Sequence, residues 1–310
     1  MKYLDDEKLR KRLTTEYIKL LDTKERRDAW EIFRDDHPDF ANEFSYTLKQ
    51  ILVADFPILV QIYNKYENFK RSLSKGEIEA YNKGLEGIFN YSTKGSSIIH
   101  QFFRDHADDL DVYTCFYCDM EYINAYTLPD EQEKDQFEID HLLDKGSCPI
   151  ISLSLFDFVP SCNVCNSRIK GKNKIEEKYL KQLSPTCQEF CVDRTVKIEL
   201  MPCGKVRRPF LAHKDDYRIE FDCHKVKAHQ YYINFFHLDE RYDFHRIEAL
   251  RIEELKMRYP QCHINKIARE LGYQPEDVKE DIFGLDFSLE HHRCFQKLRY
   301  DIYYDGMEKR

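Results

Sequence analysis

The sequence predicts an α+β fold in which a mostly helical chain surrounds a central metal-binding core and carries a small strand-rich segment. Three features lead to this prediction. Apolar residues recur at helical spacing in both terminal parts, two C-x-x-C pairs lie between them, and alternating residues with turn signals follow the second pair. We expect four parts, at residues 1–95, 96–181, 182–225 and 226–310, and the hydrophobic content of 42% suffices for a packed interior.

Residues 1–95 are predicted to be helical. Between residues 56 and 73, apolar residues recur at steps of three and four and form one face: Leu59, Ile62, Tyr66, Phe69 and Leu73. Pro57 suits the first turn of that helix. The small and polar residues 92–97 indicate a loop that ends this region.

The C-terminal third is predicted to form short strands and then helices. Residues 190–223 alternate between apolar and polar types and contain turn signals, which is typical of short strands. The clearest later helix spans residues 239–260 and is closed by Pro260. Residues 264–284 have the pattern of a helix-turn-helix with Gly272 at the turn, but their acidic second half favours core packing over a DNA-recognition helix.

Composition and charge narrow the function classes. A formal net charge of -8 argues against a chain coated with basic residues for indiscriminate nucleic-acid binding, although it allows a local basic patch. The sequence lacks an apolar run of about 18 residues, so we expect no membrane span. The charged start lacks the apolar centre of a signal peptide, and we expect a cytoplasmic protein. In that compartment, eleven cysteines favour metal binding over disulfides.

The two C-x-x-C pairs are the strongest chemical signal. Cys115 and Cys118 form the first pair, Cys162 and Cys165 form the second, and 43 residues separate the pairs. Four thiolates suffice for a closed tetrahedral zinc site. The polar surroundings of both pairs favour zinc over four cysteines that act as small apolar residues, and no thioredoxin-like pattern surrounds them.

Two later groups carry weaker signals. A second zinc site is an alternative use of the later cysteines. Its ligands would come from residues whose spacing in the sequence is irregular: Cys187, Cys191, Cys203, Cys223 and His224. His291 and His292 are interpreted as surface or interface residues.

An Asp–His pair ends a short apolar run in the segment FEIDHLLDKG, residues 137–146. Alone, such a pair is most often a polar turn. Here the segment LFDFVPSCNVCNSRIKG, residues 155–171, follows it. Together the two segments resemble the Cys-containing branch of the HNH endonuclease family, over roughly residues 100–175 of the chain. The resemblance implies a central ββα-metal core, in which a β-hairpin and a helix surround one divalent metal ion.

The resemblance also implies a role for each matching residue. Asp140 and Asn166 would be oxygen ligands of a catalytic Mg²⁺ or Mn²⁺, and His141 would be the general base that deprotonates a water molecule. Asp157 stands where the family has a central Asn. We expect Asp157 to tether the loop, and to raise the pKa of His141 if the two side chains touch. Zinc at the four cysteines would then be structural.

Basic residues follow the second cysteine pair directly: Arg168, Lys170, Lys172 and Lys174. Because they adjoin the expected metal site, we expect them to bind DNA phosphates without reading sequence. The alternative is an ordinary solvated helix face.

These features favour a metal-dependent DNA endonuclease. The two segments, together with KLRYDIY at residues 297–303, also look like the HNH nucleases of bacterial anti-phage systems of the Septu type. That resemblance implies a partner ATPase of the ABC or SMC-like kind. Two alternatives remain: a non-catalytic zinc-stabilised module that binds nucleic acid or protein, and a redox- or metal-sensing protein that uses the spare cysteines. The sequence leaves open whether RNA is cut and whether the helical ends form a homo-oligomer.

Overall fold

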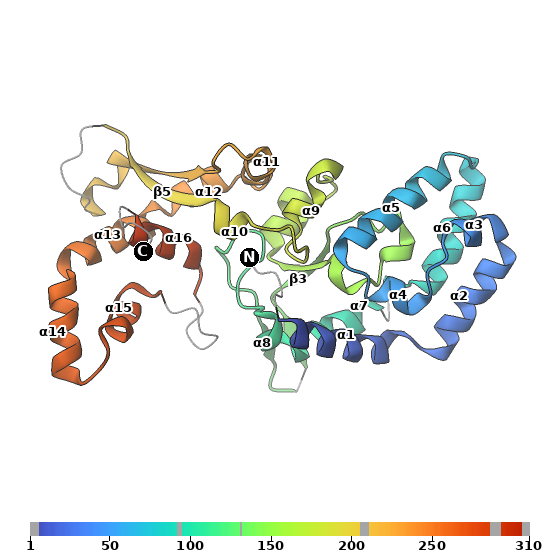
Figure 1. Cartoon of the computed structure of the whole chain (residues 1–310), viewed down its shortest axis with the longest axis horizontal. Helices are drawn as coiled ribbons and strands as arrows, with labels where there is room; N and C mark the ends of the chain where they lie inside the picture. The colour runs from blue at the N-terminus through green and yellow to red at the C-terminus, as the bar shows by residue number, and fades with distance from the viewer. Residues whose placement is uncertain (1–5, 92–94, 131, 205–210, 286–292, 306–310) are drawn as a thin grey trace. The chain divides into compact units, whose positions relative to one another are not determined.

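The computed structural model describes residues 6–91, 95–130, 132–204, 211–285 and 293–305 of the 310-residue chain. Helices make up most of this part of the chain, and its strands form three separate antiparallel pairs (Figure 1). The predicted α+β class is therefore confirmed. No helix within the described ranges is long and apolar enough to cross a membrane.

The chain divides into two compact units. Residues 2–112 and 123–190 form the N-terminal unit, and residues 113–122 with 191–310 form the C-terminal unit. The unit boundaries differ from the four parts expected from the sequence, because residues 113–122 of the expected core and residues 191–225 belong to the C-terminal unit.

The N-terminal unit opens with the helices α1 (Glu7–Leu21), α2 (Lys24–Asp36), α3 (Pro38–Glu43), α4 (Leu48–Leu52), α5 (Phe56–Lys70), α6 (Lys75–Ile88), α7 (Ser96–Asp105) and α8 (Ala107–Leu110). Local sequence explains several of their starts. Thr47 with Gln50 and Ser74 with Glu77 form capping boxes, and Pro57 lies in the first turn of α5 as predicted. The helical prediction for residues 1–95 is confirmed over the described residues.

Aromatic rings fill the interior between these helices. Trp30 stands edge-on to Phe40, with 5.9 Å between the ring centroids, and Phe40 stacks on Phe44 at 4.5 Å. Tyr66 of α5 meets Phe40 and Phe44 edge-on and is fully buried. The predicted apolar face is therefore confirmed for Leu59, Ile62 and Tyr66, which are buried, whereas Leu73 lies beyond the end of α5.

Two short hairpins follow the helices. β1 (Ala125–Thr127) pairs with β2 (Glu133–Asp135), and β3 (Glu138–His141) pairs with β4 (Phe158–Ser161). The connection from β3 to β4 contains the 3-10 turns η2 (Pro149–Ile151) and η3 (Leu155–Asp157). The π-helix η4 (Val164–Lys170) begins almost directly after β4, and η5 (Glu177–Tyr179) and α9 (Leu180–Leu183) come next.

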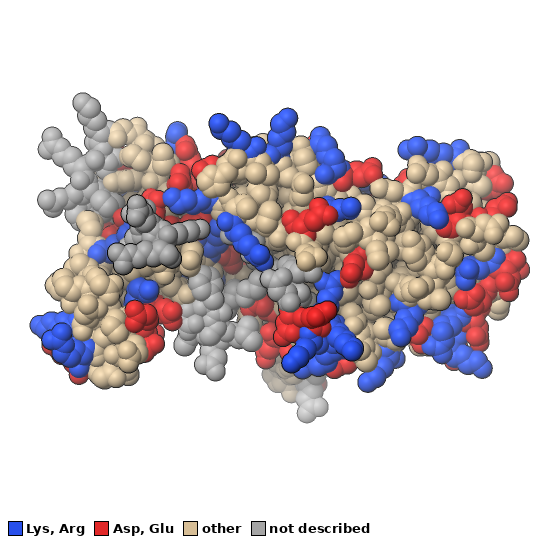
Figure 2. All heavy atoms as spheres, in the orientation of Figure 1, with Lys and Arg blue, Asp and Glu red and all other residues tan. Residues whose placement is uncertain are grey.

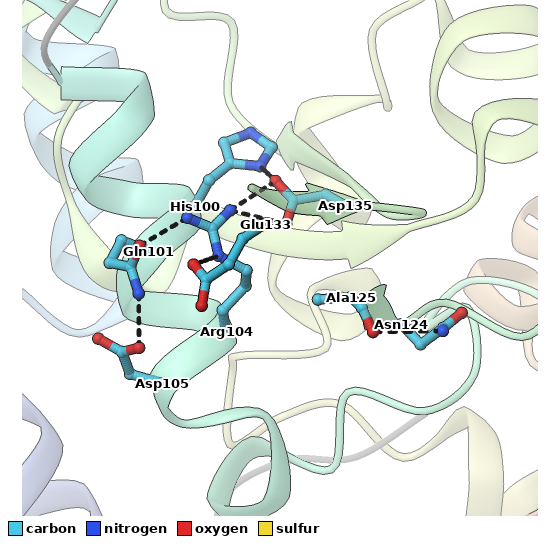
Figure 3. Close-up of polar contacts among 8 residues, drawn as sticks. All are labelled: His100, Gln101, Arg104, Asp105, Asn124, Ala125, Glu133 and Asp135. Atoms are coloured by element: carbon cyan, nitrogen blue, oxygen red, sulfur yellow. Dashed lines mark hydrogen bonds and ion pairs between the residues drawn. The ribbon is translucent and has the colours of Figure 1, made fainter. Parts of the chain in front are cut away.

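A polar cluster attaches α7 to the first hairpin (Figure 3). Asp135 Oδ2 on β2 lies 2.6 Å from His100 Nδ1, and Asp135 Oδ1 accepts a hydrogen bond from Arg104 Nη1 at 2.8 Å. Arg104 Nε also donates to Glu133 Oε2 at 2.9 Å. A two-stranded hairpin is marginally stable by itself, so these contacts explain why such short strands persist.

The C-terminal unit contains the hairpin of β5 (Lys197–Pro202) and β6 (Tyr217–Asp222), which confirms the predicted short strands. The turn η6 (Leu211–Asp216) precedes β6. The helices of this unit are α10 (Val192–Thr195), α11 (Lys227–Phe235), α12 (Leu238–Phe244), α13 (Arg246–Arg258), α14 (Gln261–Leu271), α15 (Pro275–Phe283) and α16 (Gln296–Tyr304).

Two helix predictions for this unit have different outcomes. The single helix predicted over residues 239–260 is wrong, because the chain leaves helical geometry at His245 and forms α12 and α13. The expected end before Pro260 is confirmed. α14 and α15 join at Gly272, which has φ of 76°, and bury Ile264 and Val278, as the core-packing interpretation expected.

Carboxylates from flanking helices bind outward-facing N–H groups of the β5–β6 hairpin. Ile198 N–H on β5 donates to Asp301 Oδ2 of α16 at 2.8 Å. Ile219 N–H on β6 donates to Asp243 Oδ1 of α12, also at 2.8 Å. These bonds attach α16 to one strand and α12 to the other.

Candidate functional site

Four buried cysteines come together as their spacing predicted. The sulfur atoms of Cys115, Cys118, Cys162 and Cys165 all lie within 4.8 Å of one another. Sulfurs around a tetrahedral zinc ion are about 3.8 Å apart, since each Zn–S bond is about 2.3 Å. The cluster could therefore hold a structural metal ion such as zinc. Among the described residues it is the only such group of His, Cys, Asp or Glu side chains.

The first cysteine pair is held by helices that come much later in the chain. Tyr232 of α11 donates its hydroxyl to the backbone carbonyl of Tyr117 at 2.6 Å, and Tyr242 of α12 donates to that of Cys118 at 2.6 Å. Both tyrosines are fully buried. Sequence reasoning missed these contacts because the partners lie 115 and 124 positions apart, and no local pattern links them.

The weaker group of cysteines does not form a second site. Within the part of the chain that the structure describes, no further metal-binding group unites Cys187, Cys191, Cys203, Cys223 and His224. Cys203 is exposed, and Cys191 Sγ lies 3.7 Å from His229 Nε2 instead. The predicted surface residues His291 and His292 lie outside the described residues.

Asp140 lies near the end of β3 in a buried ion pair. Its Oδ1 accepts a hydrogen bond from Lys170 Nζ at 2.8 Å, and Lys170 also donates to the backbone carbonyl of His141 at 2.8 Å. Asp140 is 5% exposed and Lys170 is 7% exposed. Lys170 therefore does not lie on an open phosphate-binding surface, which corrects its expected place among the DNA-binding residues.

The imidazole of His141 is enclosed by aromatic rings. Tyr91 and Phe158 stand edge-on to it, with centroid distances of 4.4 and 4.9 Å. Its Nε2 lies 3.0 Å from the carbonyl oxygen of Ser152, so Nε2 carries the proton and Nδ1 is the acceptor. Burial, together with nearby lysine charges, lowers the pKa of His141 to about 3. The expected rise of this pKa depended on contact with Asp157, which is not among the main groups that shift it.

Asp157 tethers the loop as predicted. Its Oδ1 accepts the backbone N–H of Leu143 at 2.8 Å, and its carbonyl accepts that of Leu142 at 3.0 Å. The side chain is fully buried, and Oδ2 has no hydrogen-bond partner among the described residues. Burial without a second partner raises the pKa of Asp157 well above its usual value.

Asn166 lies on η4 and is oriented by a glutamate of β3. Its Nδ2 donates to Glu138 Oε2 at 2.9 Å, which fixes the orientation of the side-chain amide. Asn163 and Ser167 donate to the same carboxylate, each at 2.6 Å. Glu138 was missed in the sequence, where its only signal is its place two residues before Asp140.

A cavity of about 700 Å³ brings the candidate residues together. Its lining includes Asp140, His141, Asn166, Lys145, Lys170, Lys172 and Lys174. Lys145 was also missed in the sequence, although it lies four residues after His141. Burial lowers the pKa of Lys145, and its Nζ lies 3.7 Å from the centroid of the Tyr91 ring.

The other predicted phosphate-binding residues differ in their availability. Arg168, Lys172 and Lys174 are all exposed. Lys174 also forms an ion pair with Asp144, with 2.6 Å between Nζ and Oδ2. On the face shown in Figure 2, basic and acidic side chains of the described residues are interspersed.

Comparison of the chain with protein-family models, with curated proteins and with solved structures finds no match. The chemistry of the site therefore has to be inferred from its residues.

Proposed function

We propose that this chain is a metal-dependent HNH endonuclease that hydrolyses DNA phosphodiester bonds. The observation that supports this most is the hairpin β3–β4 with η4 directly after it, because these elements bring Asp140, His141 and Asn166 to one cavity. A hairpin and a helix around a metal ion are what the resemblance to the HNH family implies.

The ligands expected for a catalytic Mg²⁺ or Mn²⁺ fit the cavity in their chemistry. Asp140 offers a carboxylate oxygen and Asn166 an amide oxygen, which are the hard ligands that these ions prefer. The Lys170 ammonium, 2.8 Å from Asp140 Oδ1, marks a position where this carboxylate already holds a positive charge. A bound ion would supply positive charge for the phosphoryl oxygens and the leaving oxygen.

His141 is the proposed general base. The Ser152 carbonyl holds its ring through Nε2 and leaves Nδ1 to accept a proton from the attacking water. Burial lowers the pKa of His141, so the imidazole is neutral and able to accept a proton, but it is a weak base in the metal-free protein. Lys145 and Lys172 line the same cavity and would bind phosphate oxygens of the DNA backbone.

Zinc at the four cysteines would have a structural role. Four protein thiolates complete a tetrahedral shell and leave no open position for a water molecule or substrate. The catalytic and structural ions would therefore be different metals at different sites.

We further propose that the nuclease acts in bacterial anti-phage defence, in the cytoplasm, beside an ATPase of the ABC or SMC-like kind. The Septu-type resemblance and the net charge of -8 support this, since an acidic chain binds DNA weakly by itself. The alternative, a non-catalytic zinc-stabilised binding module, is favoured by one observation: Asp140 is already paired with Lys170.

A plasmid-nicking assay tests the proposal. Wild-type protein with Mg²⁺ or Mn²⁺ should nick supercoiled DNA, and EDTA should stop the reaction. His141→Ala should lower the rate by about 10²- to 10⁴-fold, as expected for loss of a general base. His263→Ala, on α14 and outside the cavity, is the matched control. Equal nicking by wild type and His141→Ala, or nicking that EDTA leaves unchanged, would refute the proposed function.

A further inference from the structure

Lys170 is the buried cation of the candidate site. Lysine is rarely buried unless its charge is paired, and here Nζ contacts both Asp140 Oδ1 and the His141 carbonyl at 2.8 Å. The ammonium thus neutralises the carboxylate that the proposed function assigns to the catalytic metal ion.

A divalent ion and the Lys170 ammonium cannot both contact the Asp140 carboxylate without strong electrostatic repulsion between them. Both would lie within direct contact of one carboxylate, and the repulsion between positive charges is strong where water is largely excluded. The only carboxylate that contacts Lys170 Nζ in the described residues is that of Asp140. Binding of the divalent ion should therefore require Lys170 to move away.

The surroundings of Lys170 allow such a movement. It is the last residue of η4 and lines the cavity of about 700 Å³. Gly171 follows it with φ of 46°, and residues 171–174 are exposed. The lysine side chain has a flexible four-carbon stem, so the ammonium can turn from Asp140 into the cavity without disturbing β3.

We propose that the Lys170 ammonium competes with the catalytic divalent ion for the carboxylate of Asp140. This inference rests on the proposed function. Lys170 stabilises the carboxylate in the metal-free protein and raises the concentration of Mg²⁺ or Mn²⁺ that the site requires. It is thus a residue that sets the metal affinity of the site and has no part in contacting the DNA backbone.

Mn²⁺ titration of the zinc-loaded, full-length protein tests this, with free Mn²⁺ followed by electron paramagnetic resonance. Lys170→Met keeps the apolar stem but removes the charge, so we expect Mn²⁺ to bind about ten-fold or more tightly than to wild type. Lys170→Gln is a second neutral variant that can still donate to Asp140, and it should shift the affinity in the same direction. Lys170→Arg should remain near wild type, because the charge is retained. Lys49→Met, at an exposed position of α4 outside the cavity, is the matched control and should leave the affinity unchanged.

Two results would overturn the proposal in distinguishable ways. If Mn²⁺ binding is lost in Asp140→Asn but is equal or weaker in both neutral Lys170 variants, Lys170 does not compete and only the inference fails. If Asp140→Asn leaves all Mn²⁺ binding intact, the metal site of the proposed function fails together with the inference.

Discussion

Asp157 is fully buried and stands at the position where the HNH pattern has an asparagine, so a carboxyl group takes the place of an amide. Its raised pKa favours the protonated form, which has one O–H donor and one acceptor oxygen. A protonated carboxyl group therefore resembles the amide of asparagine in its hydrogen bonding. The acceptor oxygen still binds the N–H of Leu143, so the loop stays tethered. The departure from the HNH pattern is then a smaller chemical change than the sequence alone suggests.

Asp157→Asn should stabilise the protein. A carboxyl group whose pKa is raised by folding contributes its full stability below the unfolded value of about 3.9, and this contribution is lost as the pH rises towards the folded value. Asparagine does not titrate, so the advantage of the variant should grow as the pH rises above about 4, by at most about 1.4 kcal/mol per pH unit. Urea unfolding of both proteins at each pH measures it.

Asp157→Leu is the control for this variant, because it removes both the buried carboxyl group and the acceptor for Leu143 N–H. It should destabilise the protein by about 1–3 kcal/mol, since a buried donor loses its partner. An advantage of Asp157→Asn that shrinks as the pH rises would contradict the protonated state.

At this scale, the sequence predicted which residue types meet but not their surroundings. Asp140 and His141 are adjacent in the sequence, and the resemblance to the HNH motif added Asn166 to the predicted site. The low pKa of His141 depends on Tyr91 and Phe158, whose rings enclose it. Burial of this kind arises from tertiary packing between distant residues, and a single sequence gives no measure of it.

Elements with strong local signals were predictable. α5 has a clear apolar face and an N-terminal proline, and the β5–β6 segment alternates with turn residues on both sides. The helix over residues 239–260 was predicted as one piece because its apolar spacing continues through His245. The chain breaks there between α12 and α13, and Tyr242 of α12 contacts the first cysteine pair. A long-range contact of this kind competes with local helix propensity and leaves no periodic signal.

The cysteine cluster yields a prediction about the elements that carry it. The purified protein should contain about one zinc ion per chain, and Cys162→Ser should lower zinc content, solubility and melting temperature together, because metal binding is part of folding. Elemental analysis and thermal unfolding are the measurements. Cys262→Ser, at an exposed position of α14, should change none of these three quantities. Well-folded wild-type protein without zinc would contradict the prediction.

Across the whole molecule, the helical regions at both ends support the central segments directly. In the N-terminal unit, Tyr17 of α1 donates to the carbonyl of Leu153 at 2.7 Å, and Ser154 donates to that of Ile51 at 2.9 Å. In the C-terminal unit, Tyr232 holds the first cysteine pair. These regions are therefore more than an interaction scaffold, because deleting them would remove buried hydrogen bonds of the segments that carry the site.

Control by a partner is therefore tested better by addition than by truncation. The isolated protein should nick DNA feebly at about 150 mM salt, because few exposed basic residues contact phosphate and such binding is strongly salt-dependent. Nicking should rise when the proposed ATPase and ATP are supplied, and a companion unable to bind ATP is the control. Rapid cutting by the isolated chain at this salt concentration would show that no gating partner is needed.

The carboxylates that bind β5 and β6 have a consequence for assembly. A bare strand at the edge of a sheet can accept a strand from another chain, which is a common route to both recognition and aggregation. Here Asp301 occupies an outer N–H of β5, and Asp243 occupies one of β6. Neither strand offers an uninterrupted row of donors for an incoming backbone. A protein that binds the C-terminal unit must therefore recognise its side chains and helix surfaces, and extension of this sheet from molecule to molecule is blocked on both sides.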